Sequence, residues 1–181
     1  HLDRFGTIER YAEMKGRIKE DDSSVPAPDG AYSYYSSYIT GGQHPRFARK
    51  LRDMTGAEQL LLDGNELSRG TEYFRFGGVA ISPDHSLAAW SYDNKGSEFY
   101  ELRVRDLTSG QDQTEVLQDT AGEATWAADG KRLLFQCKAE QDTRTTELRL
   151  LDLVRGSSQL VHSSKEPVDS QALAPDGSVV Y

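Results

Sequence analysis

The sequence predicts a mainly β protein built from repeats of four short antiparallel strands, the arrangement found in the blades of a β-propeller. A short turn of the form Pro/Ala-Asp-Gly/His recurs four times, at Asp29, Asp84, Asp129 and Asp176. These aspartates are 55, 45 and 47 residues apart. A second motif, E-L-R-V-R-D-L at 101–107, returns 46 residues later as E-L-R-L-L-D-L at 147–153, and Gly110 and Gly156 follow at the same offset. Two independent markers that keep one period indicate a repeat architecture.

The second repeat shows how each unit divides into strands. Its apolar and polar residues alternate with a period of two, which favours half-buried strands over a helix. In the third strand, Leu102 and Val104 share one face, and Arg103 and Arg105 share the other. We therefore expect strands at 78–82, 86–92, 98–107 and 113–118.

Side chains around the turn repeat as well. Apolar residues precede the aspartate by three positions, at Ile81, Trp126 and Leu173. Aromatic residues follow it by six positions, at Tyr35, Trp90 and Phe135. Asp accepts hydrogen bonds from nearby backbone N–H groups, and glycine tolerates a positive φ. His85 replaces this glycine in the second copy, so we expect that turn to differ.

The repeats predict an incomplete β-propeller over residues 25–181. We expect blades at 25–66, 71–119 and 121–165, with a fourth begun at 169–181. A closed propeller has at least four blades, and the chain starts at His1 and stops within the apolar run 179–181. We therefore expect a piece of a longer chain, with a complete small protein as the alternative. A sandwich of two sheets is the alternative architecture, because it would not need equal periods.

Residues 1–22 have a different pattern and predict an amphipathic helix. Apolar residues recur there at helical spacing, at Phe5, Ile8, Tyr11, Met14 and Ile18. Polar residues and then the prolines at 26 and 28 end this segment. We expect its apolar stripe to pack on a part of the protein outside this chain.

Composition excludes several classes of protein. The 181 residues carry 29 Asp+Glu against 21 Lys+Arg, a net charge of −8, which is opposite to that of a strongly basic nucleic-acid binder. No run of eighteen apolar residues occurs, so no membrane-spanning helix is expected. Cys137 is the single cysteine and cannot form an internal disulfide. We expect a soluble, cytoplasmic protein.

The residues predict no catalytic, cofactor-binding or metal-binding site in this chain. The four histidines lack a carboxylate or cysteine at metal-ligand spacing: His1, His44, His85 and His162. Cys137 is expected to be a small buried side chain. The sequence has no G-x-S-x-G, P-loop or G-x-G-x-x-G pattern, and Gly77-Gly78 opens a strand rather than a helix.

Two charged runs have weak functional alternatives. A basic cluster could contact an anion, but its spacing mixes both faces of a strand and favours a solvated edge: Arg46, Arg49, Lys50 and Arg52. The acidic run 20–22 is expected to be a solvated linker, with attraction of a cationic ligand as the weaker alternative.

Seven segments of the chain match a known family: M-K-G-R-I-K-E-D-D-S-S-V-P at 14–26, G-A-Y-S-Y-Y at 30–35, T-G-G-Q-H-P at 40–45, L-L-L-D-G-N at 60–65, S-P-D at 82–84, K-G-S-E-F-Y at 95–100 and V-R-D-L at 104–107. In these segments the sequence resembles the oligopeptidase B branch of the prolyl oligopeptidase family of serine peptidases. The resemblance is strong over about residues 10 to 120 and depends beyond them on the repeat pattern. The blade turn alone is unspecific, since many propellers carry it. The helix, a hairpin and the second repeat together are more specific.

This resemblance implies a seven-bladed propeller that covers a C-terminal α/β-hydrolase domain carrying Ser, Asp and His in that order. It also implies that the segment before the propeller wraps the hydrolase domain. It further implies hydrolysis of short peptides after Lys or Arg, with the propeller limiting access of folded proteins. The hydrolase domain and its triad are not in this chain, so we expect the chain alone to be inactive and to need no cofactor.

A binding propeller without catalysis, of the TolB-like type, is the alternative function. A sister peptidase with another side-chain preference shares most of the same features. We expect short peptides as substrates of the missing domain, no nucleic acid or membrane partner, and self-association of the chain through open blade edges.

Overall fold

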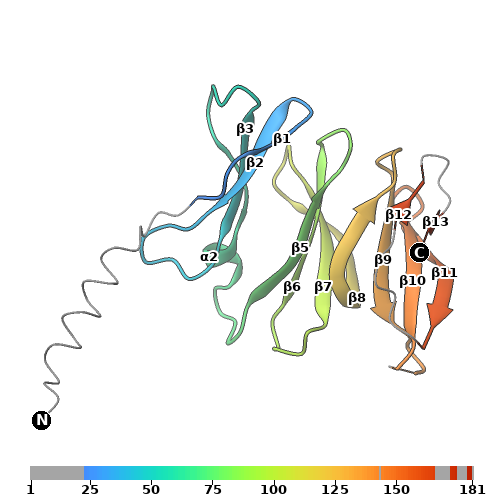
Figure 1. Ribbon diagram of the computed structural model, residues 1–181. Helices are drawn as coiled ribbons and strands as arrows, with labels where there is room; N and C mark the ends of the chain where they lie inside the picture. The colour runs from blue at the N-terminus through green and yellow to red at the C-terminus, as the bar shows by residue number, and fades with distance from the viewer. Residues whose placement is uncertain (1–22, 143, 166–171, 175–178, 181) are drawn as a thin grey trace, which may run out of the picture. The chain divides into compact units, whose positions relative to one another are not determined.

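A computed structural model describes residues 23–142, 144–165, 172–174 and 179–180 (Figure 1). The chain divides into two compact units, His1–Arg69 and Gly70–Tyr181, and each is described by itself. The described residues are mainly strands and turns, which confirms the predicted mainly β class. The helix predicted within 1–22 lies outside the described residues.

The first unit contains one antiparallel sheet whose four strands follow chain order. Its strands are β1 (Ala27–Asp29), β2 (Tyr32–Ser37), β3 (Arg46–Leu51) and β4 (Gln59–Asp63). Gly30, with φ 54°, turns the chain between β1 and β2, the role expected for the glycine of the repeated turn. A short helix, α2 (Gly64–Leu67), follows β4 and is capped by Asp63, whose side chain accepts a hydrogen bond from the Asn65 amide.

The second unit contains a seven-stranded antiparallel sheet and a separate two-stranded sheet. The larger sheet has the order β11-β10-β9-β8-β7-β6-β5. Its strands are β5 (Arg75–Ile81), β6 (Leu87–Asp93), β7 (Tyr100–Asp106), β8 (Asp112–Trp126), β9 (Arg132–Lys138), β10 (Thr146–Asp152) and β11 (Ser157–Ser164). The smaller sheet pairs β12 (Ala172–Leu173) with β13 (Val179–Val180).

β8 belongs to two groups of strands. Up to Thr120 it pairs with β7, and from Thr120 to Trp126 it pairs with β9. Asp119 and Gly122 have positive φ, 54° and 94°, and the register with β9 shifts between Thr120 and Ala124. We call β5, β6, β7 and the first part of β8 the first four-strand group, and the rest of β8 with β9, β10 and β11 the second. The sequence predicted a break between these repeats, whereas the strand is continuous.

The core of the second unit lies between these two groups. Ala89, Leu102 and Val104 of the first group pack with three residues of the second: Leu133, Phe135 and Leu151. Strands β6 and β10, which three strands separate in the sheet order, thus contribute to one cluster. The sheet therefore folds over at β8 so that the groups face each other, as blades do in a propeller.

The opposite face of the second group is also covered. Leu134 and Leu148 are fully buried there with Leu150, and Leu173 of β12 packs against them. Leu133 and Phe135 are buried on one face of β9 and Leu134 on the other, so apolar side chains follow one another along this strand and do not alternate with polar ones. The blade boundaries predicted from the repeats are consistent with these groups and stay a proposal.

The two copies of the E-L-R motif form matching turns. The Asp106 side chain accepts from the amides of Thr108 and Ser109 at 2.8 and 2.7 Å. The Asp152 side chain accepts from the second and third following amides, both at 3.0 Å. Gly110 and Gly156 then adopt positive φ, 72° and 62°. The motif therefore specifies both a strand and the turn that ends it.

The turn at His85 does not differ from its relatives, so this prediction was wrong. His85 has φ 61°, close to the 65° of Gly130 at the equivalent position. The Asp84 carboxylate fixes the turn, because it accepts from the Ser82 hydroxyl at 2.6 Å and the Ser86 hydroxyl at 2.8 Å. These hydrogen bonds hold the left-handed conformation that histidine would otherwise rarely adopt.

Candidate functional site

A groove within the second unit is the main candidate site. It lies where β5 and the second part of β8 approach each other, and it has a volume of about 740 Å³. Glycine and alanine form much of its wall, at Gly77, Gly78, Ala80, Ala89, Ala121, Gly122 and Ala124. Small side chains let the two strands run close together while leaving the groove open.

Three of these glycines are required by close contacts. A Cβ on Gly77 would lie 2.5 Å from the Ser91 hydroxyl oxygen, and one on Gly78 would lie 2.9 Å from the Gly122 carbonyl oxygen. A Cβ on Gly122 would lie 2.9 Å from the Tyr100 ring, and its φ of 94° adds strain for any other residue. The Gly77-Gly78 pair also coincides with a register shift between β5 and β6. Gly77 and Gly78 thus form a close contact between strands. They lie in a strand and not at a helix start, as predicted, but they lie inside β5 (Arg75–Ile81) and do not open it.

Ser91 of β6 joins the elements around the groove. Its hydroxyl accepts a hydrogen bond from the Gly78 amide at 2.9 Å and donates one to the Gly122 carbonyl oxygen at 2.5 Å. The side chain is fully buried. A buried hydroxyl that both accepts and donates is well satisfied, and its removal would leave two backbone groups without this partner.

Two further hydrogen bonds hold the same region. The Thr120 hydroxyl donates to the Tyr100 carbonyl oxygen at 3.0 Å, which ties β8 to β7 at the bend. The Trp126 indole N–H donates to the Ala80 carbonyl oxygen at 2.9 Å, which ties the end of β8 to β5. The groove wall is therefore fixed at both ends.

The groove offers binding chemistry rather than a reaction centre. Glu123 is the one charged side chain among the described residues that line it, beside polar groups of Tyr100, Thr125 and Gln136. These groups can hold a ligand by hydrogen bonds and one negative charge. In the part of the chain that the structure describes, no three His, Cys, Asp or Glu side chains gather to bind a metal.

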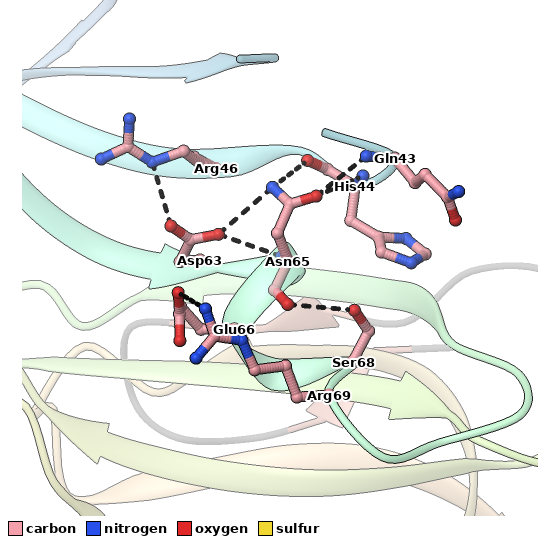
Figure 2. Close-up of polar contacts among 8 residues, drawn as sticks. All are labelled: Gln43, His44, Arg46, Asp63, Asn65, Glu66, Ser68 and Arg69. Carbon is pink, nitrogen blue, oxygen red and sulfur yellow. Dashed lines mark hydrogen bonds and ion pairs between the residues drawn. The ribbon is translucent and has the colours of Figure 1, made fainter. Parts of the chain in front are cut away.

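The first unit contains a polar cluster around Asn65 (Figure 2). The Asn65 side-chain oxygen accepts from the amides of Gln43 and His44 at 2.9 and 3.1 Å, and its NH₂ group donates to the His44 carbonyl oxygen at 3.0 Å. Asn65 also lies against Asp63, and Arg46 pairs with Asp63 at 3.2 Å. Two segments that carry the family resemblance, 40–45 and 60–65, thus form one hydrogen-bonded structure.

The predicted basic cluster is largely occupied by internal contacts. The Arg49 side chain is buried, donates to Gln59 at 2.7 Å, and lies 4.0 Å above the Tyr32 ring. Arg46 is paired with Asp63, and Arg52 donates to the Gly30 carbonyl oxygen at 3.3 Å. These contacts favour a structural role for Arg46, Arg49 and Arg52 over an anion site. The expectation of a solvated edge is wrong for Arg49, which is buried.

Cys137 is half-buried, and burial raises the pKa of its thiol. It lines a second cavity of about 720 Å³ with Phe99, Leu117, Phe135 and Lys138. The described histidines lie on separate elements: His44 in the first unit, His85 in the β5–β6 turn and His162 on β11. His1 and the acidic run 20–22 lie outside the described residues. The expectation that the chain supplies no catalytic residue stays a prediction.

Ser91 and Asn65 have no direct signal in the sequence. Ser91 stands within an apolar strand, and its two partners are 13 and 31 residues away. Asn65 contacts a hairpin more than 20 residues earlier. The L-D-G-N segment and the Gly77-Gly78 pair were the available signals, because polar or flexible residues beside apolar strands need a specific partner or a close contact.

Comparison with known proteins decides the family. A family model described as "Prolyl oligopeptidase, N-terminal beta-propeller domain" matches residues 7–177. The chain belongs to the prolyl oligopeptidase family. The predicted resemblance and the β-propeller class are thereby confirmed, and the two-sheet sandwich and the TolB-like module are not favoured.

Relatives in this family are peptidases. The chain is 30% identical to dipeptidyl aminopeptidase BI of Pseudoxanthomonas mexicana over 141 residues. This alignment covers 69% of this chain and 19% of the relative. It is also 30% identical to protease 2 of Moraxella lacunata over 112 residues, 58% of this chain and 16% of the relative. The chain thus spans about a fifth of the length of these relatives.

Solved structures show the same fold. The structure of oligopeptidase B from Leishmania major matches with a TM-score of 0.68 at 23% identity, over 87% of this chain and 30% of that one.

The described residues contain no helix with the length and apolar character needed to cross a bilayer.

Proposed function

We propose that this chain is the N-terminal part of the propeller of a serine oligopeptidase that hydrolyses short peptides after Lys or Arg. The family match over residues 7–177 is the observation that carries the proposal. The likeness to protease 2 and to an oligopeptidase B structure supports this branch of the family. The cytoplasmic location expected from the sequence belongs to the same proposal.

The role proposed for the propeller is to limit which substrates reach the catalytic domain. The packing of the second unit suits this role, because apolar side chains are buried on both faces of β9. A close-packed wall excludes folded proteins and admits extended peptides only where an opening exists. Catalysis itself would come from the Ser, Asp and His of the hydrolase domain, with serine as nucleophile, histidine as base and backbone N–H groups around the oxyanion.

The test uses the full-length protein and fluorogenic peptides blocked at the N-terminus. Under the proposal, a blocked peptide ending in Arg-Arg before the fluorophore is hydrolysed at least tenfold faster than one ending in Gly-Pro, and a serine-directed phosphonate abolishes both rates. Folded protein substrates are expected to resist cleavage, whereas short peptides from the same sequences that contain an internal Lys or Arg are cut. Equal rates on folded and unfolded substrates would contradict the filtering role. Preference for Gly-Pro would contradict the basic specificity.

A second candidate is removal of dipeptides from free N-termini. It is favoured by the 30% identity to a dipeptidyl aminopeptidase over 69% of this chain. The two activities separate on the same dipeptide in free and blocked forms, because an aminopeptidase of this kind needs the free amine. Hydrolysis of the free form alone would establish the second candidate, and hydrolysis of the blocked form would establish the first. No serine-dependent hydrolysis of either form would favour a binding propeller.

A further inference from the structure

The two four-strand groups of the second unit share a strand instead of being joined by a loop. β8 is hydrogen-bonded to β7 over its first part and to β9 over its second part, with Thr120 paired on both sides. Separating the groups would therefore require breaking one of these ladders or unwinding the bend at 119–122. A loop of several residues would have allowed the groups to hinge without such losses.

The Ser91 hydroxyl adds a second connection at this point. Its donor partner, Gly78, lies in the first group, and its acceptor partner, Gly122, lies in the part of β8 that belongs to the second. We call the contact of β5 and β6 with the second part of β8 the seam. Opening the seam would break the hydrogen bond between the Ser91 hydroxyl and the Gly122 carbonyl oxygen and leave the fully buried Ser91 hydroxyl without its acceptor, which is unfavourable. The backbone at Gly77, Gly78 and Gly122 is packed so closely that even a Cβ atom would clash there, so the strands have almost no space to slide past one another.

The apolar cluster between the groups acts in the same direction. It draws on β6 and β7 from the first group and on β9 and β10 from the second. Parting the groups would expose Leu102, Leu133 and Phe135, which are almost completely buried. Exposure of this apolar surface to water is unfavourable, so the cluster opposes separation of the two groups.

We infer that the two four-strand groups of the second unit form one mechanical unit, held by the shared strand β8 and by Ser91, and that they open only together. For the proposed filtering function, on which this consequence rests, it follows that substrates do not pass between β5 and β8. The groove beside this seam is then a surface feature of a rigid body rather than an entrance.

Native-state hydrogen exchange of the 181-residue chain tests the inference. We expect the slowest amides of β6 and of β9 to exchange through one opening reaction, with the same free energy and the same dependence on denaturant. In the Ser91→Ala variant, these amides should exchange faster in both groups by the same factor, about 5- to 30-fold. Exchange of β9 and β10 through an opening that leaves β6 and β7 protected would overturn the inference. So would acceleration in one group alone.

A matched control and a second variant keep the test interpretable. Ser33 is a buried serine of the first unit whose hydroxyl donates to the Arg52 carbonyl oxygen, so Ser33→Ala should leave exchange in β6 and β9 unchanged. Should Ser91→Ala fail to fold, Trp126→Phe removes the other hydrogen bond across the seam and should accelerate both groups equally. Since the readout is exchange and not hydrolysis, its failure would leave the proposed peptidase function untouched.

Discussion

The indole N–H of Trp126 donates a hydrogen bond of 2.9 Å to the carbonyl oxygen of Ala80, 46 residues earlier in the chain. The two residues lie on the first strands of successive repeats, at the ends of β8 and β5. The apolar position three residues before the turn aspartate, noticed in the sequence as a repeated marker, thus has a specific use in one of its copies. It fastens one repeat to the next.

Replacement of Trp126 by phenylalanine should lower the free energy of unfolding of the second unit by about 0.5 to 1.5 kcal/mol, because the partly buried Ala80 carbonyl oxygen loses its donor. Urea denaturation followed by circular dichroism measures this change. Trp90→Phe is the matched control, since it also loses an indole hydrogen bond, to Asp112 at 3.0 Å, but within the first group. An unchanged unfolding midpoint in Trp126→Phe would show that this bond does not support the seam.

Several features of the fold follow from local sequence alone. The alternation at 101–107 predicted that Leu102 and Val104 would be buried, and both are, at 1% and 4% exposed. Arg103 and Arg105 lie on the other face, where they pair with Glu101 and Asp112. Such predictions succeed because a strand has a strict period of two and its burial follows from that period.

Other features depend on contacts that no local pattern encodes. The segment from Asp119 to Gly122 was expected to separate two strands, yet β8 runs through it, because its first part pairs with β7 and its second part pairs with β9. His85 was expected to alter its turn, yet Ser82, Asp84 and Ser86 impose the same conformation. For the candidate site, the glycines were visible in the sequence, but Ser91 was not, because its partners are brought to it only by folding.

Asn65→Ala should destabilise the first unit by about 2 kcal/mol, since two backbone amides and one carbonyl of the 43–44 segment lose their partner at roughly 1 kcal/mol or less each. Hydrogen exchange at the Gln43 and His44 amides should accelerate at the same time. Gln43→Ala is the control, because that side chain is exposed and points away from the cluster in Figure 2. Exchange unaltered by Asn65→Ala would mean that the hairpin does not depend on this side chain.

Acid should weaken the β5–β6 turn through Asp84. Hydrogen bonds from the Ser82 and Ser86 hydroxyls lower the pKa of Asp84 from 3.8 to about 2. A carboxylate with a lowered folded-state pKa stabilises the fold above its unfolded pKa, and this contribution is lost as the pH falls from about 4 to 2. Asp84→Asn should therefore reduce stability at pH 7 by less than about 1 kcal/mol, since this exposed group is screened by solvent.

The pH dependence of that difference is the decisive measurement. Unfolding midpoints of the wild type and Asp84→Asn should converge between pH 4 and pH 2, where the wild-type carboxylate takes up its proton. A gap of constant size across this range would indicate that the aspartate acts through shape and not through charge.

The two copies of the E-L-R motif should respond equally to the same substitution. Gly110→Ala and Gly156→Ala each place a side chain at a positive φ, which costs about 1 to 2 kcal/mol, while neither meets a close steric contact. Urea titrations of the two variants should give the same loss, and Thr108→Ala, at an exposed neighbouring position, should give almost none. Markedly unequal losses would show that the turns are alike in geometry but not in energy.

The shared strand also determines where a protease could cut this chain. In most repeat proteins the junction between units is a loop, and loops are where limited digestion begins. Here Thr120, inside the junction at 119–122, is paired with both neighbouring strands and is fully buried. The exposed loops lie instead inside the repeats, such as 94–99 between β6 and β7. Digestion products would then begin and end in the middle of the sequence repeats, so fragment boundaries found by proteolysis would not mark the repeats themselves.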